Sequence, residues 1–405
     1  MKYLVLIPDG MADEKIDQLG GRTPMQAAKK TTMDMLAKRS MVGTVSNVPT
    51  GMVPESDTAN LAILSYDPKV YSKGRSPLEA VSMGIDMKPE DTAYRCNIVT
   101  VSDEEGIPYE ERTMLDHSAD EISTEEADVL VKALDEHFGN ERRKFYTGVS
   151  YRHCLIVKNG IDQYNFMRPH DILGKCIKDY LPDPDNGGKE FLDIMKESFD
   201  VLNHHPINEE RRKRGLRPAN SAWFWSPGKK PQLPSFKEKW GLNGTVISAV
   251  DLIKGIGLCA QMRSIDVDGA TGNVHTNYTG KANAAIEAFK NGSDLVYVHV
   301  EAPDECGHRA EIENKVLSVE LIDEKILSPV YEYLRSCGDD FKIMVLPDHP
   351  TPIRIRTHSI DPVPFMIYDS REDHLGVDGF SEESATKTGI YLPEGYKLMQ
   401  KLTEN

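Results

Sequence analysis

Four short runs of apolar residues along the chain predict buried β-strands. They are rich in β-branched and aromatic residues and cover positions 3–7, 294–300, 341–346 and 364–369. A longer stretch, about 311–334, repeats apolar residues close to the 3.6-residue period of a helix. Continuous apolar strands joined through a helix are typical of a largely parallel sheet covered by helices on both faces. We therefore expect an α/β core.

The middle of the chain has a different pattern, with more charges and loops between about 85 and 244. Breaks rich in Pro and Gly interrupt it, and helices are expected at 124–137 and 188–202. Clusters of polar residues that could carry chemistry occur only towards the two ends of the chain. We therefore expect residues 1–84 and 245–405 to form the core, with residues 85–244 inserted as a second, α+β domain.

The composition is that of an ordinary globular protein. The 405 residues carry 48 Lys and Arg against 64 Asp and Glu, which gives a net charge of −16 with neutral His. No apolar run is long enough to cross a membrane, and the first apolar run is too short for a signal peptide. Six cysteines without a CxxC pair do not suggest a disulfide framework. We expect a cytoplasmic protein without membrane or nucleic-acid partners; its oligomeric state stays open.

Carboxylates and imidazoles follow the predicted strands. These residues are Asp9, Asp304, His308, Asp348, His349 and His358. Ligands bind beyond the carboxyl ends of the strands in such sheets, so we expect these side chains to converge. Together they suit two divalent ions of the Mn²⁺ or Zn²⁺ kind. Two such ions about 4 Å apart can bind both the attacking and the leaving oxygen of a phosphoryl transfer. One Asp after a strand is more often a turn former or helix cap, so the prediction depends on all the clusters together.

Ser56 precedes an apolar run that is compatible with a helix, and its simplest role is to cap that helix. The same position also suits a nucleophile. Free backbone N–H groups at a helix N-terminus hold phosphate, and a coordinated metal lowers the pKa of a hydroxyl. The Ser-Asp-Thr sequence does not decide between these roles, and the nucleophile hypothesis depends on the carboxylate and imidazole clusters.

The order of these residues is similar to the pattern of the alkaline phosphatase superfamily. More narrowly, the chain resembles the cofactor-independent phosphoglycerate mutases of the archaeal type. The segments that carry the resemblance are PDGMAD, TGMVPESDTANLAILSYDP, GRSPLEA, GVSYRHCLIV, GLNGTVISAVDLIKGIG and PDHPTP. The resemblance implies an alkaline-phosphatase-like core with an inserted substrate-binding cap. It also implies a glycolytic isomerase that interconverts 3- and 2-phosphoglycerate through a phosphoserine, without 2,3-bisphosphoglycerate.

By the same resemblance, Ser56 is the serine that becomes phosphorylated. The first metal ion would be held by Asp9, Ser56, Asp348 and His349. The second would be held by Asp304, His308 and His358. The ions in the family are usually Mn²⁺, sometimes Mg²⁺, Co²⁺ or Zn²⁺. The candidates for contact with the small phosphorylated substrate are Arg152, His153, Arg214, Arg217 and Lys281; surface ion pairs or solvent exposure are the simpler roles for the basic ones.

Two segments of the expected cap depart from the archaeal pattern. Residues 220–228 read NSAWFWSPG, with Ala222 and Ser226 at positions where the family commonly has Ile and Gly, and residues 116–120 read DHSAD in place of DYSAG. Because both segments lie in the expected substrate domain, they leave the substrate open. The alternative is a homoserine kinase-type phosphotransferase that uses ATP on the same metal–serine site. A phosphomonoesterase and a binding protein with a degenerate site are further alternatives.

Overall fold

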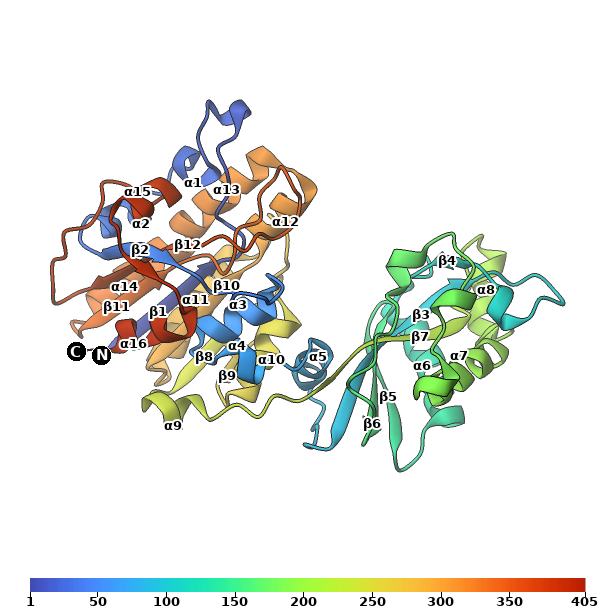
Figure 1. Ribbon diagram of the computed structural model, residues 1–405. Coiled ribbons are helices and arrows are strands. Elements are labelled where there is room, and N and C mark those ends of the chain that lie inside the picture. The colour runs from blue at the N-terminus through green and yellow to red at the C-terminus, as the bar shows by residue number, and fades with distance from the viewer. Residues whose placement is uncertain (405) are drawn as a thin grey trace. The chain divides into compact units, whose positions relative to one another are not determined.

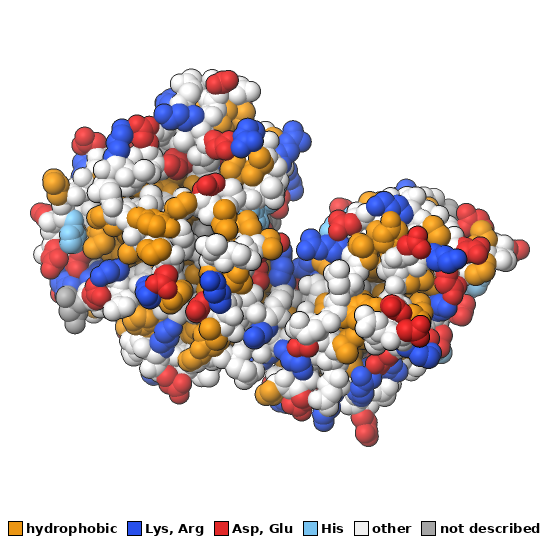
Figure 2. All heavy atoms as spheres, viewed as in Figure 1, with side chains coloured by type: hydrophobic (Ala, Val, Ile, Leu, Met, Phe, Trp, Pro, Cys, Tyr) orange, Lys and Arg blue, Asp and Glu red, His pale blue; other side chains and the backbone are white. Residues whose placement is uncertain are grey.

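The computed structural model describes residues 1–404 and divides the chain into two compact units (Figure 1). The first, here called the core, comprises Met1–Ser72 and Gln232–Asn405, and the second, the insert, comprises Lys73–Pro231. Within the described residues, no helix combines the length and the apolar composition needed to cross a membrane. On the face shown in Figure 2, acidic and basic side chains are interspersed on both units.

The insert begins earlier and ends earlier than the sequence pattern predicts. Helix α5 (Ser76–Ser82) lies before the expected boundary at residue 85 but packs against strands of the insert. Helix α9 (Phe236–Trp240) lies before the expected boundary at 244 but belongs to the core, where the Phe236 N–H donates to the Ala260 carbonyl. Neither short helix carries a periodic signal strong enough to assign it to a domain.

The core contains an eight-stranded sheet in the order β13-β2-β12-β11-β1-β10-β8-β9. Its strands are β1 (Lys2–Pro8), β2 (Met41–Val45), β8 (Gly244–Ile247), β9 (Arg263–Ile265), β10 (Leu295–Val300), β11 (Phe341–Val345), β12 (Val363–Asp369) and β13 (Tyr391–Leu392). Five neighbouring strands of this sheet are parallel to one another: β11, β1, β10, β8 and β9. Strand β12 runs antiparallel to both of its neighbours, β11 and β2. The four strands predicted from apolar runs are confirmed as β1, β10, β11 and β12.

Helices cover both faces of the core sheet. They are α1 (Pro24–Ala27), α2 (Thr31–Ala37), α3 (Ser56–Ile63), α4 (Pro68–Tyr71), α9, α10 (Asp251–Cys259), α11 (Tyr278–Lys290), α12 (Ala302–Arg309), α13 (Ile312–Ile322), α14 (Ser328–Ser336), α15 (Glu382–Lys387) and α16 (Leu398–Thr403). The helix predicted at about 311–334 is present as α13 and α14, joined by a π-helical turn. Every residue of β10 is buried because successive side chains enter opposite, equally covered faces.

The insert is an α+β unit, as predicted. Its antiparallel sheet has the order β4-β3-β6-β5, with β7 also paired to β3. The strands are β3 (Asp91–Val101), β4 (Met114–Asp116), β5 (Arg143–Val149), β6 (Arg152–Lys158) and β7 (Ser221–Lys229). Helices α6 (Thr124–Phe138) and α7 (Lys189–Leu202) correspond to the two predicted helices and pack on this sheet, and α8 (Pro206–Lys213) follows them.

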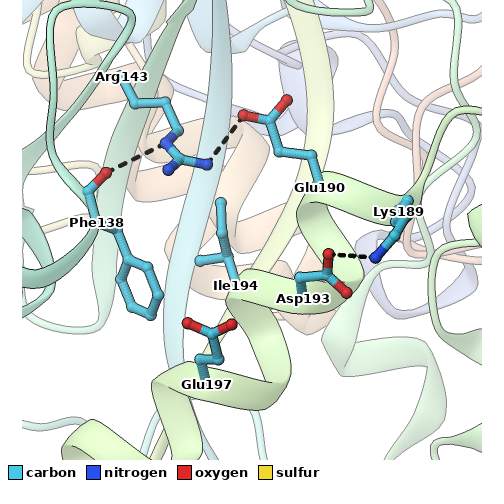
Figure 3. Close-up of a pocket in the computed structure, with 7 residues that line it drawn as sticks. All are labelled: Phe138, Arg143, Lys189, Glu190, Asp193, Ile194 and Glu197. Carbon is cyan, nitrogen blue, oxygen red and sulfur yellow. Dashed lines mark hydrogen bonds and ion pairs between the residues drawn. The ribbon is translucent and has the colours of Figure 1, made fainter.

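A hollow of about 530 Å³ opens beside α6, β5 and α7 in the insert (Figure 3). It is lined by Phe138, Arg143, Lys189, Glu190, Asp193, Ile194 and Glu197. The Arg143 guanidinium lies 3.0 Å from the Glu190 carboxylate, and the Lys189 ammonium lies 2.7 Å from that of Asp193. These charged groups therefore neutralise one another, and the hollow shares no residue with the predicted substrate contacts.

Candidate active site

Parallel strands bring the predicted metal ligands to one edge of the core sheet. Pro8 at the end of β1 pairs with Val300 at the end of β10, and Leu6 pairs with Val345 at the end of β11. The chain segments that follow these strands therefore leave the sheet side by side. They carry Asp9, the helix α12 with Asp304 and His308, and the pair Asp348-His349.

Asp304, His308 and His358 form one compact group. The Nε2 atoms of His308 and His358 lie 3.2 and 3.3 Å from the two carboxylate oxygens of Asp304, and 3.0 Å from each other. Nδ1 of His308 faces the Arg356 carbonyl at 3.0 Å, and Nδ1 of His358 faces the Pro54 carbonyl at 2.6 Å. A carbonyl only accepts hydrogen bonds, so both Nδ1 atoms carry hydrogen. Both Nε2 atoms are thereby directed at the Asp304 carboxylate, where a cation fits between them.

Asp9, Ser56, Asp348 and His349 form a second group beside the first. Nε2 of His349 lies 3.1 Å from the Ser56 Oγ, 3.6 Å from Asp9 Oδ1 and 3.5 Å from Asp348 Oδ2. Asp9 Oδ1 is buried and has no hydrogen-bond partner among the described residues. Burial, together with the negative charges of Asp348 and Asp304, raises the pKa of Asp9 well above its usual value. An unsatisfied buried oxygen among crowded carboxylates fits a bound cation.

Ser56 is the first residue of α3, and Glu55 holds the N-cap position. The simple capping role considered for Ser56 is therefore wrong. Its hydroxyl instead faces His349, as the nucleophile hypothesis requires. The first N–H groups of a helix have no partner within the helix, so the start of α3 can hold an anion next to this hydroxyl.

Comparisons with known proteins identify relatives along the length of the chain. A family model described as 2,3-bisphosphoglycerate-independent phosphoglycerate mutase matches residues 37–208. A protein of that name from Methanosarcina barkeri is 48% identical over 98% of both chains. A protein from Geobacter sulfurreducens, named as a probable mutase of the same kind, is 43% identical over the full length of both.

The chain belongs to the 2,3-bisphosphoglycerate-independent phosphoglycerate mutase family. Among solved structures, the cofactor-independent phosphoglycerate mutase of Thermoplasma acidophilum is 28% identical, covers 99% of both chains and has a TM-score of 0.69. A protein of Pyrococcus horikoshii is 27% identical over 99% of this chain and 97% of its own, with a TM-score of 0.81. These likenesses confirm the predicted family and the predicted α/β fold.

Of the substrate contacts that the family resemblance implies, Arg152 and His153 lie at the start of β6. The Arg152 side chain is exposed and its guanidinium lies 5.0 Å from the centre of the Tyr151 ring. His153 is buried, and its Nδ1 accepts a hydrogen bond from the Gly148 N–H at 3.1 Å. Burial lowers the pKa of His153 to about 3, so its ring is neutral. Arg152 is therefore available to a ligand, whereas His153 is held inside the insert.

The other two arginines are engaged in ion pairs within the insert. The Arg214 guanidinium pairs with the Glu126 carboxylate. The Arg217 guanidinium lies 3.2 Å from both Asp116 and Asp120. A substrate contact by either arginine requires it to leave or share these carboxylates, and the predicted roles of both stay predictions.

Lys281 lies in the core on α11 and is fully buried. Its Nζ donates to the His299 carbonyl at 2.8 Å. Burial lowers the pKa of Lys281 to about 8, although the nearby carboxylates of Glu301 and Asp9 act in the opposite direction. The structure therefore places this ammonium behind the ligand cluster and not at an exposed surface, so direct contact with phosphate stays a prediction.

Sequence reasoning missed several residues that touch the ligand cluster, His299 and Thr351 among them. Nε2 of His299 lies 3.0 Å from Asp9 Oδ2, and His299, Asp9 and Asp348 together form a third group that could hold a cation. Burial lowers the pKa of His299 to about 4. Thr351 donates its hydroxyl hydrogen to Asp304 Oδ1. His299 lies inside the predicted strand 294–300, whereas all the predicted ligands lie beyond the ends of strands. The alternation of side chains along that strand is the signal that could have identified His299.

Proposed function

We propose that this protein interconverts 3-phosphoglycerate and 2-phosphoglycerate through a phosphorylated Ser56, without 2,3-bisphosphoglycerate. The observation that carries the proposal is the position of the Ser56 hydroxyl, 3.1 Å from His349 Nε2 at the N-terminus of α3. Asp9 and Asp348 lie within 3.6 Å of the same imidazole nitrogen. Membership of a family whose relatives are named phosphoglycerate mutases supports this substrate over homoserine.

Two divalent ions fit the side chains at the sheet edge. The first would be held by Asp9, Ser56, Asp348 and His349, and the second by Asp304, His308 and His358. A mixture of carboxylates and imidazoles suits Mn²⁺, which we propose as the ion, and the same donors accept Mg²⁺, Co²⁺ or Zn²⁺. When bound, such ions lower the pKa of a serine hydroxyl and neutralise phosphoryl oxygens.

In the first half of the reaction, the Ser56 Oγ attacks the phosphorus of the substrate in line. The Oγ–P bond forms as the bond from phosphorus to the glycerate oxygen breaks, and the proton lost by the serine hydroxyl ends on the released glycerate. The N–H groups at the start of α3 hold the phosphoryl oxygens. Positioning and charge neutralisation supply most of the rate in such transfers.

In the second half, the other hydroxyl of the glycerate attacks the phosphorus, and the Ser56 Oγ leaves and regains a proton. The glycerate must stay bound between the two steps, and water must stay out, because attack by water would release phosphate. We propose that the insert retains the glycerate carboxylate through basic side chains. Arg152 is our first candidate because its guanidinium is exposed and has no ion pair among the described residues, whereas Arg214 and Arg217 are paired with carboxylates.

A coupled assay with 3-phosphoglycerate and Mn²⁺, without 2,3-bisphosphoglycerate, tests this function. We expect 2-phosphoglycerate to form at a rate typical of metabolic enzymes, about 1–1,000 per second, with little phosphate release. A parallel reaction with ATP and homoserine should yield no ADP above the level seen with ATP alone. ADP that forms only with homoserine, with no turnover of phosphoglycerate, would overturn the proposal in favour of the kinase.

A further inference from the structure

Asn60 lies one helical turn after Ser56 on α3, and its side chain joins the serine to a predicted metal ligand. Its Nδ2 donates one hydrogen bond to the Ser56 carbonyl at 2.8 Å and another to Asp348 Oδ2, also at 2.8 Å. Its Oδ1 accepts a hydrogen bond from the Tyr297 hydroxyl. Asn60 and Tyr297 are both fully buried, and Asp348 is almost so.

The partners of this amide allow only one orientation. A side-chain amide has two hydrogens on nitrogen and none on oxygen, whereas an ionised carboxylate and a backbone carbonyl only accept. If the Asn60 amide were turned over, its oxygen would face the Asp348 carboxylate and the Ser56 carbonyl, and its nitrogen would face the Tyr297 hydroxyl. Each of these two contacts would then bring two buried acceptors together with no hydrogen between them, which is unfavourable because neither acceptor can turn to water instead.

Tyr297 reaches Asn60 from the sheet. Side chains of a strand alternate between faces, so Tyr297 and His299 of β10 share one face while Val296 and Val298 enter the apolar cluster on the other. Tyr297 touches α3 through Asn60, and His299 touches Asp9. Asp348 also accepts bonds at Oδ1 from the Gly10 N–H at 3.2 Å and the His349 N–H at 2.9 Å. The Asn60 amide thus donates to Asp348 Oδ2, whereas the two backbone N–H groups donate to Oδ1.

We infer that Asn60 is a positioning residue, which fixes the Asp348 carboxylate relative to the nucleophile Ser56, and that Tyr297 sets the direction of its amide. This inference rests on the proposed function, because fixing the Asp348 carboxylate matters for the reaction only if Asp348 binds the first ion. The side chain of Asn60 contacts the Ser56 carbonyl, the Asp348 carboxylate and the Tyr297 hydroxyl, so it acts through the ion site. Residues that orient metal ligands in this way typically change metal affinity about 10- to 100-fold when replaced.

The test is a calorimetric titration of the metal-free protein with Mn²⁺, carried out on wild type, Asn60→Ala, Tyr297→Phe and the double variant. We expect Asn60→Ala to weaken one of two bound ions about 10- to 100-fold and to leave the other unchanged. Tyr297→Phe should weaken the same ion by less. In the Asn60→Ala background, Tyr297→Phe should have no further effect, because the hydroxyl acts through the amide.

Tyr66→Phe is the matched control. Tyr66 is also fully buried in the core, and its hydroxyl donates to the Pro234 carbonyl at 2.8 Å, away from the carboxylates. It should lower the melting temperature of the metal-free protein about as much as Tyr297→Phe, without changing Mn²⁺ affinity. If wild type binds two ions and both network variants bind them as tightly, the inference is wrong while the proposed function stands. If wild type itself binds no ion, the proposed function fails with it.

Discussion

Replacing Ser56 with alanine should lower mutase activity by roughly 10⁴-fold or more, because removing a nucleophile leaves only binding and charge stabilisation. The fold should survive, since Ser56 is not the residue that caps α3. Metal binding should persist through the carboxylates and imidazoles that surround the lost hydroxyl. The measurement is the initial rate with 3-phosphoglycerate and Mn²⁺, with circular dichroism and metal content on the same preparation.

Ser72→Ala provides the comparison for this loss. Ser72 follows α4 in the core, so its replacement deletes the same hydroxyl without touching the ligand cluster. Its turnover should match that of wild type within about twofold. A Ser56→Ala variant that kept substantial activity would show that phosphate does not pass through this serine.

Replacing Asp304 with asparagine should lower activity by roughly 1,000-fold, since it removes several kcal/mol of transition-state charge stabilisation with the second ion. Both oxygens of Asp304 contact imidazole nitrogens, and Asp304 therefore joins His308 to His358. Burial raises the pKa of Asp304, but hydrogen bonds from these two rings hold it well below its usual value. Metal analysis after gel filtration should find one ion retained in place of two.

The pH dependence of Mn²⁺ binding provides a second measurement on Asp304→Asn. The hydrogen bond to Asp304 raises the pKa of His308 to about 9, so in the metal-free protein this ring is protonated at neutral pH. An ion must displace that proton, and affinity in wild type should rise with pH up to about 9. In Asp304→Asn the largest cause of the raised pKa of His308 is gone, and the rise in Mn²⁺ affinity should end at lower pH.

The neighbouring Glu305→Gln variant controls for the change in charge. Glu305 lies on the same helix and pairs with Arg309 at 2.9 Å, outside the ligand cluster. It should keep two ions and near-normal turnover. Two ions and full activity in Asp304→Asn would contradict the assignment of Asp304 as a ligand.

The sequence was sufficient to predict the sheet edge because the signal there is local. A buried strand of apolar residues followed at once by Asp9, or by Asp348 and His349, identifies both the strand and its functional end. Parallel pairing then brings residues far apart in the sequence together, as the registers Pro8–Val300 and Leu6–Val345 show. His358 follows the same strand nine residues after His349, and only its assignment to the second ion came from the family resemblance.

The remaining contacts depend on packing that no local pattern encodes. Asn60 resembles any polar residue on a helix until Tyr297 and Asp348 are placed against it. Lys281 resembles a solvent-exposed lysine of an amphipathic helix, and only the fold shows that its ammonium is buried against the His299 carbonyl. The ion pairs of Arg217 likewise join positions about a hundred residues apart.

The most direct test of the account is to find the phosphoryl group on the enzyme during turnover. Wild-type protein would be mixed with 3-phosphoglycerate and Mn²⁺, quenched in acid within milliseconds, digested and sequenced by mass spectrometry. The account predicts phosphate on Ser56 that disappears when the substrate is exhausted. Full mutase turnover with phosphate on another residue, or with none on the protein, would contradict it.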